Sequence, residues 1–192
     1  MSKLRRLPPI AALVFLLAGT RSWAEERPRF IPTRDVDIVY EVTREEQPSF
    51  RERVRWLASV RLERIDGPGT STVIFDRKAN ELTLLNDASR TYSQLDGASP
   101  WPIRPEQDAA LIRGAESVVA GLRCAEWSWI ESDETHTACV TTDGVLLRFA
   151  VNGKTSVEAR SVSYGAQAPE LFQLPAGYAP AFLAPEAPRL VR

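Results

Sequence analysis

The chain has 192 residues, of which 44% are hydrophobic and 26% are charged, with two Cys and one His. This length and apolar content suit one domain with a packed core and exclude a wholly disordered chain. The formal net charge of −1 lacks the clustered basic excess of nucleic-acid-binding proteins, so we expect no nucleic-acid partner.

The first 24 residues have the pattern of a secretory signal peptide. Basic residues precede the apolar run Ile10–Ala18, and the small residues Ser22 and Ala24 precede a predicted cleavage site. The apolar run is far shorter than the roughly 20 residues that span a bilayer, although an uncleaved anchor is the alternative. Cleavage leaves 20 Lys and Arg against 25 Asp and Glu. We therefore expect a periplasmic chain without a transmembrane span, beginning with an N-terminal lead over 25–34.

Alternating apolar and polar residues over 35–96 are typical of half-buried β-strands. We predict strands over 35–43, 52–64, 72–75, 82–85 and 90–95, separated by short turns. Within the long run 52–64, Val54, Trp56 and Val60 fall on one face. Short strands at roughly ten-residue spacing indicate a sandwich or a barrel.

The pattern changes at residues 106–120. Apolar residues there recur at helical spacing, namely Ala109, Ile112, Ala115 and Val119. Acidic residues stand near the start and Gly121 follows the end, as at many helix termini. We predict one helix over 106–120.

Strands resume over 122–130, 135–141, 145–151 and 155–164, and Asn152-Gly153 is a strong hairpin signal. The predicted fold class is mainly β (α+β), a curved antiparallel sheet or incomplete β-barrel with one central helix. This half-barrel-like domain covers 35–180, and a Pro-rich C-terminal tail covers 181–192.

Both cysteines, Cys124 and Cys139, lie in the exported part of the chain. In an oxidising compartment two cysteines most simply form a disulfide, and here they fall on neighbouring strands of one hairpin. Free thiols or a metal pair are the alternatives. With one His and no Cys-x-x-Cys spacing, we expect no metal site.

Few residues suggest catalysis. His136 stands among polar residues on a predicted strand, where a solvated side chain is a simpler interpretation than a general base. The carboxylates around Asp133 sit at a predicted hairpin tip, where a solvated turn is simpler than a cation site. We expect no enzyme activity and no cofactor. A further hypothesis is a hydrolase that uses two carboxylates, although the sequence does not indicate which two would act together.

Aromatic residues have two interpretations. They form an ordinary core, or they line the concave face of a half-open barrel that takes an apolar guest. On the second interpretation the ligand-binding residues are Tyr40, Trp56, Phe75, Tyr92, Trp127 and Trp129.

Arginines of the first half also have two interpretations. They are solvated strand charges that discourage edge pairing, or they form a docking surface for an acidic partner. The residues are Arg53, Arg55, Arg61, Arg64, Arg77 and Arg90.

The order of these elements, with Thr-x-Asp-Gly-Val-x-Leu-Arg at 141–148 and Phe-x-Leu-Pro-x-Gly-Tyr at 172–178, resembles bacterial periplasmic proteins of the half-barrel superfamily of lipoprotein carriers and sensors. The resemblance covers roughly 35–180. It implies a strongly curved sheet closed by helices, with a cavity for lipid or lipoprotein acyl chains. The chain lacks the early helix of the carriers, and no acyl-binding residue maps onto it.

Two functions follow for a non-enzymatic protein. The first is binding of an apolar ligand, a lipid or a lipidated partner in the concavity. The alternative is an envelope structural or protein-interaction module with a closed core, whose arginine face contacts a protein partner.

Overall fold

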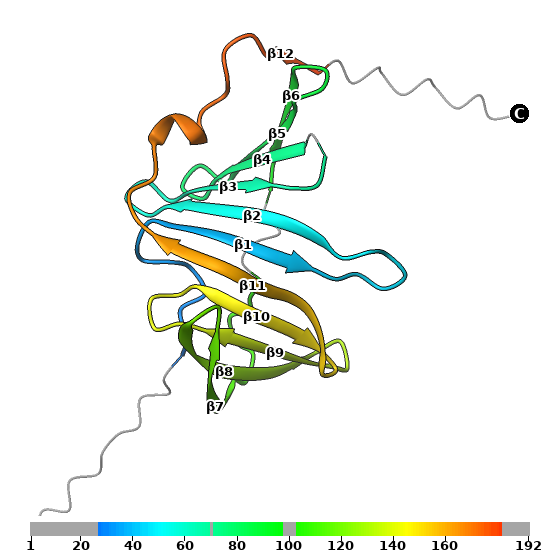
Figure 1. Cartoon of the computed structure of the whole chain (residues 1–192), viewed down its shortest axis with the longest axis vertical. Helices are drawn as coiled ribbons and strands as arrows, with labels where there is room; N and C mark the ends of the chain where they lie inside the picture. Colours follow the sequence, from blue (N-terminus) through cyan, green and yellow to red (C-terminus); the bar gives the residue numbers. More distant parts are fainter. Residues whose placement is uncertain (1–26, 70, 98–102, 182–192) are drawn as a thin grey trace, which may run out of the picture.

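The computed structural model describes residues 27–69, 71–97 and 103–181. The predicted signal peptide over 1–24 and nearly all of the predicted tail lie outside the described residues. The described strands form one twelve-stranded sheet in the order β12-β6-β5-β4-β3-β2-β1-β11-β10-β9-β8-β7 (Figure 1). Neighbouring strands are antiparallel, except that β12 pairs parallel to β6.

The strands are β1 (Val36–Val42), β2 (Phe50–Leu57), β3 (Leu62–Asp66), β4 (Ser71–Asp76), β5 (Glu81–Asn86), β6 (Thr91–Asp96), β7 (Ile112–Val119), β8 (Leu122–Glu131), β9 (Glu134–Val140), β10 (Leu146–Val151), β11 (Lys154–Tyr164) and β12 (Ala179–Pro180). A single 3-10 turn, η1 (Pro169–Phe172), is the only helical element among the described residues.

The prediction of a central helix over 106–120 is wrong. Residues Ile112–Val119 form strand β7, which pairs with β8, and the described residues contain no α-helix. Gly114 disfavours a helix, β-branched residues favour a strand, and Ala120-Gly121, with φ of 49° and 78°, closes a tight hairpin into β8. The fold is therefore nearly all β rather than α+β. None of the helical segments in the described ranges is long and apolar enough to cross a membrane.

The predicted strand over 52–64 is two strands. A turn over 58–61 separates β2 from β3, and Arg61 there has a φ of 60°. The carboxylate of Asp35 accepts a hydrogen bond from the Ala58 backbone N–H at 2.8 Å, which supports the turn. Val60 is consequently 49% exposed instead of lying on the inner face.

The main hydrophobic core lies on one face of the sheet and runs from β2 through β1, β11, β10 and β9 to β8. The alternation in β1 is regular, because Val36, Ile38, Tyr40 and Val42 are buried and the residues between them are half-buried. Register shifts in four strand pairs, β1–β11, β10–β11, β9–β10 and β7–β8, accompany the twist of the sheet, whose end strands β6 and β7 run steeply across the middle strands (Figure 1).

A second, smaller cluster gathers Leu57, Ile74, Leu85 and Phe172. Phe172 comes from η1, so the C-terminal segment packs on the β2–β6 half of the sheet (Figure 1). Beyond η1 the chain reaches β6, where the Ala179 N–H donates to the Arg90 carbonyl at 3.0 Å and β12 pairs with the edge.

Candidate functional site: an arginine-lined groove beside a filled aromatic face

Five of the six residues predicted to bind a ligand are buried on one face of the sheet. Trp56 lies opposite Glu63 and Phe75 lies opposite the same residue, so both point to the side that carries Tyr40. The remaining two of the five, Trp127 and Trp129, point the same way from β8. The sixth residue, Tyr92, packs on the second cluster against η1, on the opposite face.

The chain itself covers the middle of this aromatic face. The ring of Phe30, from the N-terminal lead, meets the ring of Trp129 edge-on, with centroids 6.1 Å apart. The Tyr40 hydroxyl donates to the Leu146 carbonyl at 2.7 Å. The void between Tyr40 and Trp56 has about 20 Å³, which is room for about one water molecule, whereas a pocket of about 440 Å³ opens on the other side of Phe30, where Trp56 and Arg61 line it. Binding of an apolar guest on this face stays a prediction, and between Tyr40 and Trp56 it would require the lead to move.

The loop after β9 holds the N-terminal lead in place. The Asp143 carboxylate accepts hydrogen bonds from the Thr141 hydroxyl at 2.6 Å, the Tyr164 hydroxyl at 3.0 Å and the Arg34 guanidinium at 3.0 Å. The Asp143 carbonyl also accepts the Thr33 backbone N–H at 2.9 Å. Burial alone would raise the pKa of Asp143, but these three side-chain donors outweigh it and hold that pKa below its ordinary value.

Gly144 lets the lead approach this loop. Its φ is +95°, and a Cβ at this position would lie 2.3 Å from the carbonyl oxygen of Ile31. No side chain fits there. The Thr-x-Asp-Gly-Val phrase of the sequence is thus a clamp that fixes residues 31–34 to the end of the sheet.

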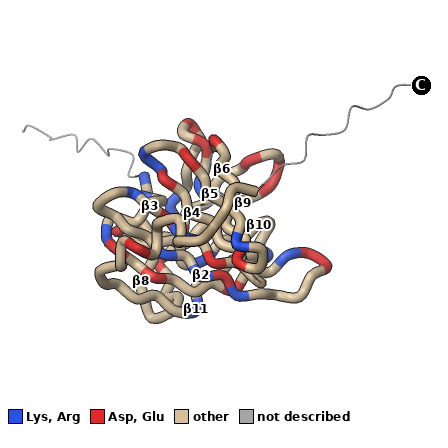
Figure 2. Tube along the Cα trace, turned by 90° about the horizontal axis from the view of Figure 1, so that it is seen from above, with Lys and Arg blue, Asp and Glu red and all other residues tan. Residues whose placement is uncertain are grey.

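A groove of about 710 Å³ lies between the lead and the β7–β8 hairpin. It is bordered by four arginines and one glutamate, Arg27, Arg29, Arg113, Arg123 and Glu116, and its remaining wall includes Trp127, Ala125 and Val140. Acidic and basic residues are otherwise interspersed along the described chain (Figure 2). The groove therefore stands out as a basic site with a partly apolar wall.

The groove arginines are only partly neutralised. Arg113 lies 3.7 Å from Glu116 in an exposed ion pair, and its guanidinium is 6.0 Å from the ring centroid of Trp127. Arg27 donates to the backbone carbonyls of Gln107 and Ala109. Within the described ranges, neither Arg29 nor Arg123 forms an ion pair with an acidic side chain.

The arginine surface predicted from the first half of the chain is different in character. Arg53 donates to Asp37 at 2.8 Å, and Arg64 donates to Asp66 at 2.8 Å. Arg55 lies between the two carboxylates. Burial would raise the pKa of Asp66, but Arg64 and Arg55 hold it below its ordinary value. These strand arginines are thus occupied by aspartates of the same sheet.

Of the remaining predicted arginines, Arg61 and Arg90 stand in turns and Arg77 is paired with Glu63. The sequence analysis missed the groove because its arginines are far apart in the chain. Arg113 lay within the mistaken helix, and only the β7–β8 pairing, in which it faces Trp127, brings it to the groove.

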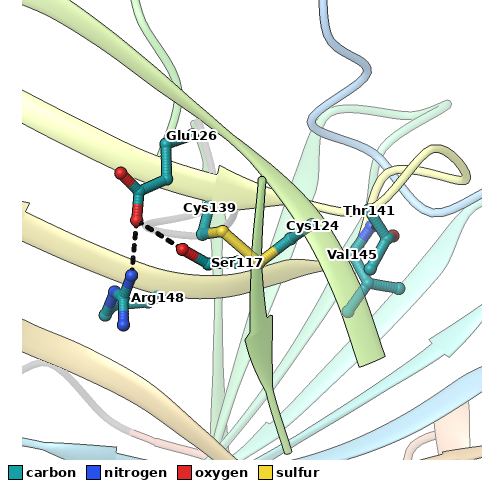
Figure 3. The surroundings of a disulfide bond; sticks show 7 residues. All are labelled: Ser117, Cys124, Glu126, Cys139, Thr141, Val145 and Arg148. Atoms are coloured by element: carbon teal, nitrogen blue, oxygen red, sulfur yellow. Dashed lines mark hydrogen bonds and ion pairs between the residues drawn. A yellow bond between two sulfur atoms is a disulfide. The ribbon is translucent and has the colours of Figure 1, made fainter. Parts of the chain in front are cut away.

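A disulfide joins β8 to β9 behind the groove wall, between Cys124 and Cys139, whose Cα atoms are 5.3 Å apart (Figure 3). Beside it the Glu126 carboxylate accepts the Ser117 hydroxyl at 2.9 Å and the Arg148 guanidinium at 2.5 Å (Figure 3). These contacts link β7, β8, β9 and β10. Since Cys124 also lines the groove, this cross-linked patch supports one groove wall.

Edge strand β7 borders the same groove. Its side chains Ile112 and Val118 are 69% and 66% exposed, and the neighbouring Ile130 of β8 is 74% exposed. Among the described residues no further strand pairs with β7, whereas β12 covers the opposite edge of the sheet. The groove and this edge together form the candidate site.

His136 contributes no visible catalytic arrangement. It is partly buried between the rings of Trp129 and Phe149, with centroids 5.4 Å and 5.5 Å away, instead of being solvated as predicted. Its nearest carboxylates, Glu131 and Glu134, are both 3.9 Å away. Over the ranges that the structure describes, no three His, Cys, Asp or Glu side chains gather in a way that could hold a metal ion.

No family model matches the chain, and no curated protein does. Among solved structures the chain is similar to MucB, with a TM-score of 0.55 and 14% identity over 77% of this chain and 59% of MucB. It is also similar to MucB in the Pseudomonas aeruginosa MucA/MucB complex, with a TM-score of 0.53 and 15% identity over 74% and 56% of the two chains. PNGF-II gives a TM-score of 0.47 and 13% identity over 77% of this chain and 30% of PNGF-II.

The similarity to MucB concerns the fold, because sequence identity at this level establishes nothing further. This similarity agrees with the half-barrel architecture that the sequence resemblance implied. The helices that the resemblance also implied are absent from the described residues. The chain spans about a third to three fifths of the length of these solved chains.

Proposed function

We propose that the chain is a periplasmic protein-interaction module without catalytic activity, whose partner is another protein of the cell envelope. One observation carries the proposal. The chain's own lead covers the middle of the aromatic face, whereas the site at β7 combines an unpaired strand edge with a basic groove.

The periplasmic location rests on the signal-peptide pattern of residues 1–24 and on the disulfide, which is stable in an oxidising compartment. The solved structures of similar fold support the choice of a protein partner, since MucB is described in complex with MucA and with MucA(peri). That partner belongs to MucB, and the chemistry of a partner of this chain has to come from its own surface.

The strand edge supports the proposal physically. An edge strand presents unpaired backbone N–H and C=O groups to another chain, and proteins usually cover such edges. β12 does so beside β6, but among the described residues no second strand pairs with β7, although β11 approaches it. Adding a strand to an open edge is a common way of binding an extended segment, with neighbouring side-chain pockets giving specificity.

Photo-crosslinking in the intact periplasm tests the proposal. A benzoylphenylalanine at Val118, which is 66% exposed on β7, should give one discrete adduct with an exported or membrane-anchored protein. The same probe at Lys78, exposed in the turn between β4 and β5, is the control and should give none. Mass spectrometry of the adduct identifies the partner.

The competing lipid-binding function makes the opposite prediction. It expects no adduct from β7 and a bound lipid mass in native mass spectra of the mature chain purified from the periplasm. That result would replace the interaction module by a carrier whose lead moves away from Trp129.

A further inference from the structure

We infer that the arginine-lined groove between the lead and the β7–β8 hairpin binds an acidic segment of the partner protein. The inference rests on the proposed function and adds the chemistry of the partner. It depends on the four guanidinium groups around the groove and on the open strand beside them.

Charge is the first argument. Four arginines against one glutamate line this groove, in a chain whose predicted mature form has five more acidic than basic residues. The strand arginines of the β1–β3 region are matched by Asp37 and Asp66, so they leave little unpaired positive charge. The groove is where a negatively charged partner gains most from the field of the protein.

The kind of positive charge is the second argument. A guanidinium presents a planar fork of donors that matches a carboxylate, and two such forks can hold successive acidic side chains. Arg29 and Arg123 are exposed and, among the described residues, without an acidic partner. Arg113 extends over Trp127, so a bound segment would meet an apolar surface as well as a charge.

The groove suits a peptide better than an anionic lipid surface. Its wall carries the glutamate Glu116, which disfavours a dense array of phosphates but accepts a mixed peptide. On the aromatic face that could take acyl chains, Phe30 occupies the space against Trp129. The neighbouring β7 supplies backbone donors and acceptors, which an extended peptide can use and a lipid headgroup cannot.

Binding of designed peptides to the mature, disulfide-bonded chain tests the inference. The probe is a fluorophore-labelled eight-residue peptide of alternating Glu and Thr. The control peptide has the same length and the opposite charge, with Lys in place of Glu. Fluorescence anisotropy should show binding of the acidic peptide only, weakened by added salt because exposed charges are screened.

Charge reversal locates the site. Arg29→Glu and Arg123→Glu should each weaken binding of the acidic peptide by about tenfold or more, given the usual strength of hydrogen bonds to charged groups. The double variant should instead bind the lysine peptide. Arg51→Glu, on the exposed side of β2 and outside the groove lining, is the matched control and should leave binding unchanged. Arg→Gln versions of both groove positions serve if charge reversal disturbs folding.

The inference is wrong if the acidic peptide fails to bind. It is also wrong if the peptide binds the groove variants as well as it binds the wild type. The same holds if vesicles containing phosphatidylglycerol bind the wild type and not the double variant while the peptide does not bind. A crosslink from Val118 that persists in the double variant would leave the interaction module intact and remove only the acidic-segment assignment.

Discussion

The guanidinium of Arg77 and the carboxylate of Glu63 lie 2.7 Å apart inside the aromatic face, with side chains only 10% and 4% exposed. Arg77 also lies 5.2 Å from the ring centroid of Phe75 and 5.5 Å from that of Trp56. Burial lowers the pKa of Arg77, although the adjacent Glu63 opposes the shift. The aromatic face therefore holds an ion pair that is largely removed from solvent.

Breaking this pair should be costly. Glu63→Leu removes the carboxylate that lies against the buried Arg77 guanidinium, and we expect a loss of about 3–5 kcal/mol in the free energy of unfolding. The double variant Glu63→Leu/Arg77→Met removes both charges and should lose less than Glu63→Leu alone. Urea unfolding of the three proteins measures this. A loss below about 1 kcal/mol in the single variant would show that solvent reaches the pair.

The clamp on the N-terminal lead gives a second prediction. Gly144→Ala places a Cβ against the Ile31 carbonyl and should push the lead off the sheet, while Gly153→Ala meets no atom within 4 Å. Both glycines have a positive φ, so the Gly153 variant carries only the backbone cost of about 1–2 kcal/mol. We expect Gly144→Ala to lose clearly more stability in thermal unfolding.

An apolar fluorescent dye separates release of the lead from general destabilisation. With the lead displaced, the rings of Phe30 and Trp129 are exposed, so the folded Gly144→Ala chain should bind the dye and the Gly153→Ala chain should not. Equal dye binding by the two variants would argue against the lead as the cover of the aromatic face. Dye binding by the wild type would restore the prediction that this face takes an apolar guest.

Much of the strand pattern could be predicted from the sequence because local signals were strong. The alternation in β1 and the Asn152-Gly153 turn correspond to observed elements. The errors arose where local and tertiary signals disagree. The helical spacing of apolar residues over 106–120 concealed an edge strand. The turn that interrupts 52–64 is supported by a hydrogen bond between Ala58 and Asp35, which are 23 positions apart in the chain.

The candidate site was harder to predict than the fold. The sequence analysis named Trp127 from its strand, but the arginines that line the groove with it come from the lead, from β7 and from β8. The two phrases behind the family resemblance have structural roles here. Gly144 admits the lead, and Phe172 anchors the C-terminal segment on the second cluster. Short motifs therefore predicted contacts within the fold, while the open surface depends on pairings that no local pattern records.

Acid should loosen the clamp. The pKa of Asp143 in the folded chain is held below its ordinary value of 3.8, so the ionised form favours folding. This contribution is complete above the unfolded pKa and is lost as pH falls through the folded pKa. Asp143→Asn should therefore flatten the fall of unfolding free energy between about pH 5 and pH 2. Asp66, shifted in the same direction, remains in the variant and keeps part of the slope. An unchanged slope would mean that Asp143 is solvated in the folded chain.

Opening the disulfide should weaken the groove wall as well as the fold. Cys124 and Cys139 are 15 positions apart, and a loop of that size is worth about 3 kcal/mol in chain-entropy terms. We expect Cys124→Ser/Cys139→Ser to lose about that amount in urea unfolding, and the wild type to match it once reductant is added. An intact mass two hydrogens below the reduced value identifies the bond in the purified chain. If the wild type showed no mass difference and no response to reductant, the two cysteines would be free thiols. The groove wall would then be supported at this position by the Glu126–Arg148 contact and not by a disulfide.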